Sequence, residues 1–188
     1  MISKADKLAS SSLSNAPAAE LRLRWKLWGA LGDLLNDMPA ALLQAEAVNR
    51  LLPKVTDEQL GVPRDDIRIV VSGTRLFAAS DQVPAQEQAM KELEGLYAEF
   101  MGRTPPAQAF AARCRWWQAF WLSFAGRTKE AKVAIMQAHK LLLDAPAPAS
   151  LRIRVATTYV SLMRTLPPLK TKNPLIASAS SDVLLVHV

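Results

Sequence analysis

The spacing of apolar residues near the start of the chain predicts a helix over residues 18–36. Its apolar positions recur every three or four residues and so share one helical face: Leu21, Trp25, Trp28, Leu31 and Leu35. Between residues 21 and 27, apolar and basic side chains instead alternate strictly, which is the period of a half-buried strand. We expect the helix, because helical spacing takes over after Trp28.

Prolines and glycines divide much of the remaining chain into further stretches of helical spacing. These stretches predict helices over residues 40–52, 85–101, 107–125, 129–143 and 150–166. Apolar residues at the start of the last stretch also alternate, at Leu151, Ile153 and Val155, so a strand is an alternative there.

Residues 54–80 are the least helical part of the sequence. Gly61 and Pro63 indicate a loop, and the β-branched run 67–71 is followed by a turn signal at 72–74. We therefore predict a small β-hairpin near residues 67–77, packed on helices because an isolated hairpin is only marginally stable. The predicted fold is mainly α, built from antiparallel helical hairpins, and the alternative is α+β.

A length of 188 residues fits one domain, and its 50% hydrophobic and 21% charged residues are typical of a globular protein. We expect a flexible lead over residues 1–17, a single helical domain over 18–166, and a tail over 167–188 that is a loose arm or an edge strand. The lead has no apolar stretch long enough for a signal-peptide core, and no segment is long enough for a membrane span. We therefore expect a soluble protein, and the single cysteine, Cys114, suits a reducing cytosol, so we expect a cytoplasmic location.

The most specific pattern in the sequence lies within residues 112–145. Small and apolar residues stand where two antiparallel helices would approach closely, around a turn glycine: Ala119, Leu122, Gly126, Ala131, Ile135 and Ala138. This stretch resembles one tetratricopeptide repeat, although Gln118 stands at a usually large apolar position, and a generic helical hairpin explains the same residues. The resemblance implies a scaffold that holds a peptide or protein on its concave face, and it implies no reaction. Because the matching positions are packing positions, it assigns no ligand-binding residues in this chain.

The formal charge of +6 is compatible with a nucleic-acid partner, because long-range attraction depends on the sign of the charge. Aromatic rings interleaved with cations can stack on exposed bases and contact phosphates. The candidate contacts are Arg113, Arg115, Lys129, Arg152 and Arg154. The simpler interpretation of the neighbouring Trp117 and Trp121 is core packing, with Phe120 and Phe124 beside them and the arginines reaching outward.

Catalytic chemistry finds little support in the sequence. The glycines are scattered, which argues against a phosphate-binding loop, and a nucleophile needs a base within hydrogen-bond reach. His139 and His187 are the histidines, and a pairing of Cys114 with His139 is conceivable only across a helical hairpin. Asp65 and Asp66 are adjacent, which in an extended segment directs them to opposite sides. We therefore expect no enzyme, no cofactor and no metal site.

The leading hypothesis is a non-catalytic protein-interaction module, an adaptor or chaperone-like scaffold that holds a protein partner against the helices of residues 107–166. The alternative is a basic accessory protein that binds nucleic acid. The sequence assigns neither the partner nor the oligomeric state.

Overall fold

The computed structural model describes residues 16–35, 37–79 and 82–164. The predicted lead, except for its last two residues, and the predicted tail lie outside these ranges. Within the described residues every regular element is a helix. In chain order the elements are α2 (Pro17–Gly29), a π-helical turn (Ala30–Leu34), α3 (Met38–Leu51), a 3-10 turn (Leu52–Lys54), α4 (Asp57–Leu60), α5 (Arg64–Ala78), α6 (Val83–Met101), α7 (Gln108–Phe124), α8 (Thr128–Leu143) and α9 (Ala149–Arg164).

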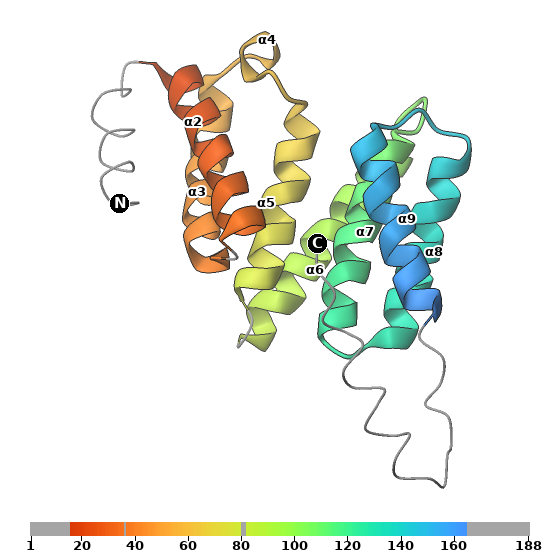
Figure 1. Cartoon of the computed structure of the whole chain (residues 1–188). Coiled ribbons are helices and arrows are strands. Elements are labelled where there is room, and N and C mark those ends of the chain that lie inside the picture. The colour runs from red at the N-terminus through yellow and green to blue at the C-terminus, as the bar shows by residue number, and fades with distance from the viewer. Residues whose placement is uncertain (1–15, 36, 80–81, 165–188) are drawn as a thin grey trace, which may run out of the picture.

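The long helices form a row of antiparallel neighbours (Figure 1). α2 packs on α3, α3 on α5, and from α5 to α9 each helix packs on the next. α7 also contacts both α5 and α9, so these three helices form one layer, against which α6 and α8 pack. The mainly α class is thus confirmed for the described residues.

The predicted β-hairpin near residues 67–77 is wrong, because these residues form most of α5. The β-branched run favoured a strand, but the polar side chains of Arg64, Arg68 and Arg75 are spaced by four and seven residues, which is a narrow helical stripe. Most other positions of the helix are buried: Ile67, Ile69, Val70, Val71, Ser72, Gly73, Thr74 and Leu76. The helical signal was therefore present in the sequence as this charged stripe, and the prediction failed because it followed the β-branched run instead.

The central position of α5 explains this burial. Ile67 and Val71 belong to the N-terminal part of the core, with residues of α2, α3 and α4, whereas Ile69, Val70 and Leu76 belong to the C-terminal part. Burying a side chain of this size stabilises the fold by about 1.5–3 kcal/mol relative to leaving it exposed. α5 therefore joins the two halves of the molecule.

The two segments whose alternation allowed a strand are both helical, α2 and α9. Leu21 of α2 and Leu31 of the π-helical turn are buried, while Leu35 beyond that turn is exposed. Arg24, which the alternation placed on the polar face, is buried: its side chain donates to Glu20 and Gln44. Tertiary contacts thus decide between the two periods.

α7 and α8 pack against each other, and both lie where the sequence predicted helices. The small and apolar residues singled out in the sequence are buried: Ala119, Leu122, Ala131, Ile135 and Ala138. Gly126 follows the first helix with a φ of 72°, a left-handed conformation that glycine adopts without a steric cost. Gln118 is also buried, and its amide contacts Glu94 and Arg115.

Ion pairs connect the helices at their partly exposed edges. Arg75 on α5 pairs with Glu46 on α3 at 2.6 Å and with Glu92 on α6 at 2.8 Å. Glu99 on α6 pairs with Arg68 and Arg103, each at 2.7 Å. Many arginines of this basic chain are thus already neutralised by carboxylates. No helix among the described residues is long and apolar enough to cross a membrane.

Candidate binding groove

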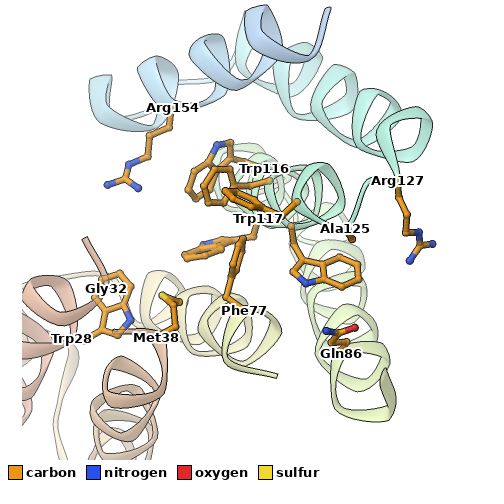
Figure 2. Close-up of a pocket in the computed structure, with 13 residues that line it drawn as sticks. Trp28, Gly32, Met38, Phe77, Gln86, Trp116, Trp117, Ala125, Arg127 and Arg154 are labelled. Carbon is orange, nitrogen blue, oxygen red and sulfur yellow. The ribbon is translucent and has the colours of Figure 1, made fainter. Parts of the chain in front are cut away.

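A groove of about 790 Å³ lies between the N-terminal helices and α7, and Arg154 of α9 borders it (Figure 2). We call this the aromatic groove. Its aromatic walls are Trp28, Phe77, Trp116, Trp117, Phe120, Trp121 and Phe124. A volume in this range suits a drug-sized molecule or a few side chains of a peptide.

α7 supplies most of these rings, because its aromatic residues recur at helical spacing. Trp117, Trp121 and Phe124 follow one another by four and three residues, which aligns them along one face. Phe120 stacks on Trp116, with ring centroids 5.4 Å apart, and meets Phe124 edge to face at 5.0 Å. The rings of Trp116, Trp117, Phe120 and Phe124 thus form a continuous apolar row, and Trp121 lines the same groove.

The opposite wall comes from helices that precede α7 by many residues. Phe77 of α5 contacts three rings of the row, with centroid distances of 5.8 Å to Trp117, 5.2 Å to Phe120 and 5.9 Å to Phe124. Trp28 of α2 donates its indole N–H to Thr74 Oγ1 at 2.9 Å. That hydrogen bond fixes the Trp28 ring at the edge of the groove.

The row is buried at one end and open at the other. Trp117 is 8% exposed, as core packing predicts, whereas Trp121 is only partly buried. Trp116 is 6% exposed and donates its indole N–H to Thr158. Phe124 is 73% exposed, so the sequence-based expectation that it packs in the core is wrong. The aromatic residues of α7 thus change from buried to exposed toward the C-terminal end of the helix.

Two arginines lie on opposite sides of this row (Figure 2). The guanidinium of Arg154 is 5.4 Å from the centroid of Trp116, and that of Arg127 is 6.0 Å from the centroid of Trp121. Arg127 also pairs with Glu130 at 2.6 Å, an exposed ion pair. Among the described residues that line the groove, the charged side chains are these two cations.

The five basic residues proposed for nucleic acid occupy different environments. Arg113 pairs with Asp66 at 2.6 Å, and Arg115 pairs with Glu94 and lies 3.7 Å from the Tyr97 centroid. Arg152 donates to the carbonyl oxygens of Leu142 and Ala145 at 2.8 and 2.6 Å, near the end of α8. Lys129 is exposed on α8. Of the five, Arg154 lines the groove.

The residues considered for catalysis also lie apart from the groove. Cys114 is fully buried, and burial raises the pKa of its thiol to about 12, so the thiolate is not formed near neutral pH. His139 stacks on Tyr159 with centroids 4.7 Å apart. His187 lies outside the described residues.

Asp65 and Asp66 both pair with arginines. Asp65 pairs with Arg68 and Arg103, and burial raises the pKa of Asp66 while Arg113 opposes that shift. Within residues 16–35, 37–79 and 82–164, no group of three or more histidine, cysteine or carboxylate side chains is placed to hold a metal ion.

Comparison of the chain with known proteins does not add a family. No protein-family model, curated protein or solved structure matched it. The groove is therefore interpreted from its own geometry.

Sequence reasoning found the aromatic cluster on α7 but missed Phe77 and Trp28 as its counterparts. For Trp28, the helical spacing of the apolar residues in α2 predicted a buried face, but it did not indicate which helix that face would contact.

Proposed function

We propose that this chain is a non-catalytic protein-interaction module, an adaptor or chaperone-like scaffold, whose aromatic groove binds a segment of a partner protein. The observation that carries the proposal is the groove itself, with an exposed Phe124 continuous with buried tryptophans. Aromatic anchors in a partly desolvated groove supply much of the binding energy at protein interfaces.

The arrangement of the helices gives additional support. α7 and α8 keep the packing residues that resemble a tetratricopeptide repeat, and that resemblance implies a concave binding face. The groove lies on the layer formed by α5, α7 and α9, with α2 and α3 opposite. The environment of Cys114 gives no support to nucleophilic catalysis.

Affinity capture with the immobilised full chain tests this proposal. The double variant Trp121→Ala/Phe124→Ala removes two rings of the groove, and we expect it to lose the partners that the unchanged chain retrieves. The matched control is Leu43→Ala/Met136→Ala, which truncates two exposed apolar side chains outside the groove. Circular dichroism establishes that both variants are folded. Equal capture by the groove variant and the control would refute the proposal.

Nucleic-acid binding is the second candidate function. Its support is the position of Arg154 beside Trp116 at the groove, an arrangement compatible with base stacking and phosphate contact. The ion pairs of Arg113 and Arg115 reduce the number of cations that face solvent, so this candidate stands second.

A further inference from the structure

We infer that residues 174–186, which follow the described part of the chain, dock as an amphipathic helix on an exposed apolar face of α8 and α9. We call this surface the end face, and its residues are Leu143, Ile153 and Val160. None of the three lines the aromatic groove, so the inference does not depend on the proposed function. It is supported by the position of α9 in the row of helices, by the exposure of the end face and by the spacing of apolar residues in 174–186.

α9 is the last described helix of the row, and it takes the place of the first member of a helix pair (Figure 1). α5 packs on α6, and α7 packs on α8. α7 also packs on both members of the α5–α6 pair, and α9 packs in the same way on both members of the α7–α8 pair. Within the described residues, α9 has no second member of its own. In arrays of stacked helix pairs, a capping element covers the apolar surface of the last helix.

The end face lies beside the contact between α8 and α9. His139 of α8 stacks on Tyr159 of α9, and Leu143 stands one turn beyond His139 on the same side of α8. Ile153 and Val160 are seven residues apart, so they share one stripe of α9 next to Tyr159. Their exposed fractions are 62% for Leu143, 64% for Ile153 and 43% for Val160. This surface corresponds to the side on which a second helix of the pair would pack.

The sequence after α9 contains a stretch whose pattern fits this face. Its apolar residues recur every three or four positions, so a helix over 174–186 presents them on one side: Leu175, Ala179, Val183 and Val186. Asn173 and Pro174 stand at its start, and these residue types favour the N-cap and the first position of a helix. From Leu175 to Val183 a helix advances about 12 Å, close to the distance of about 10 Å between positions 153 and 160 of α9.

The connecting segment is long enough to place this helix on the end face. Residues 165–173 span at most about 30 Å when extended, whereas α9, with 16 residues, is about 24 Å long. Residues 174–186 can therefore begin near either end of α9. Because the segment belongs to the same chain, its effective concentration at the end face is on the order of millimolar, which favours it over a separate partner.

Hydrogen exchange of the full chain, measured by mass spectrometry, tests the inference from the side of the segment. We expect the amides of residues 174–186 to exchange about tenfold more slowly than in Val183→Asp, which places a carboxylate on the docking side. Leu184→Asp makes the same kind of change at the adjacent residue, which points away from that side, and should keep the slow exchange. Fast exchange in the unchanged chain, or equal acceleration by both variants, would overturn the inference.

Variants of the end face separate docking from helix formation by the segment alone. Ile153→Asp/Val160→Asp alters two exposed positions, so the fold should be retained, which circular dichroism checks. This variant should accelerate exchange in residues 174–186 as much as Val183→Asp does. Leu43→Asp, at an exposed position of α3, is the control and should leave that exchange slow. Slow exchange that persists in Ile153→Asp/Val160→Asp would contradict the inference.

A second copy of the chain is the competing occupant of the end face. Light scattering after size-exclusion chromatography determines the mass of the full chain and of Ile153→Asp/Val160→Asp. We expect a monomer in both cases, because the segment covers the face within one chain. A dimer of the unchanged chain that this variant abolishes would assign the end face to self-association and overturn the inference.

Discussion

The Trp117 ring packs directly against the backbone of Gly73, so that a β-carbon at residue 73 would lie 2.7 Å from both Cε2 and Cε3 of the indole. Real β-carbons essentially never approach other atoms this closely. The contact lets α5 and α7 come together and places Trp117 in the wall of the aromatic groove. Glycine at position 73 is therefore required by packing, although it lies inside a helix.

Substitution Gly73→Ala should destabilise the protein. Alanine is the better helix former by about 1 kcal/mol, but forcing a methyl group into a packed core costs about 1–3 kcal/mol, and a large indole has little room to move. We expect a net loss of free energy of unfolding, measured by urea denaturation, and a shifted Trp117 fluorescence spectrum.

Gly95→Ala is the matched control, since Gly95 also lies within a helix but a β-carbon added there would meet no side chain or neighbouring helix within 4 Å. This substitution should stabilise the protein by about 0.5–1 kcal/mol. A stabilised Gly73→Ala variant would show that the Trp117 contact does not restrict residue 73.

The pair of arginines around Glu99 should make stability depend on acid pH. Hydrogen bonds from Arg68 and then Arg103 lower the pKa of Glu99 from its ordinary value of 4.5 to about 2. The unfolded chain therefore takes up a proton before the folded chain does, so this contribution is present above pH 4.5 and is lost as the pH falls toward 2.

The variant Glu99→Gln should accordingly show a shallower loss of stability in this pH range, measured by urea denaturation at a series of pH values. The effect is small because the Glu99 side chain is 41% exposed and solvent weakens the pairing. Glu87→Gln, an exposed change on the same helix outside this network, is the control. An unchanged acid limb in Glu99→Gln would contradict the prediction.

Cys114 should be inert in the folded protein. Its side chain is fully buried, and burial raises the pKa of the thiol to about 12, so both access and thiolate formation are suppressed. A chromogenic disulfide reagent at a pH of about 8, near the ordinary pKa of a thiol, should react slowly with the native chain and rapidly after denaturation. Rapid reaction of the native chain would show that the α7 core opens readily.

Binding to single-stranded nucleic acid should be weak and sensitive to salt. Because Arg113, Arg115 and Arg152 already have protein partners, we expect a dissociation constant in the non-specific range, on the order of 10⁻⁵ M at physiological salt. An electrophoretic shift assay at two salt concentrations checks this. Lys129→Glu/Arg154→Glu should reduce binding further, and tight, salt-independent binding would contradict the prediction.

Local sequence signals were sufficient where a helix has one polar face and clear breaks. Residues 107–125 and 129–143 were predicted as helices, and the structure places α7 at Gln108–Phe124 and α8 at Thr128–Leu143. The prolines before α7 and Gly126 between the two helices determine locally where these helices begin and end. The periodic apolar face favours a helix whichever part of the core covers it.

α5 shows where these signals fail. Over the short run from Ile67 to Val71 the β-branched residues resemble a strand, whereas over the whole of α5 the arginines at 64, 68 and 75 share one helical face, so the short window outweighed the longer period. The contacts with α3, α6 and α7 determine its structure, since a helix packs between them and satisfies its own backbone.

Some features of the aromatic groove could likewise be predicted from the sequence, whereas others depend on the tertiary structure. The sequence determined that α7 carries a row of rings, because helical spacing alone aligns Trp117, Trp121 and Phe124. Only the tertiary structure decided that Trp28 and Phe77 face this row, that Phe124 is exposed and that arginines stand at both ends. The physical reason is that burial and opposite walls depend on how distant helices pack, which the residues of one helix do not specify.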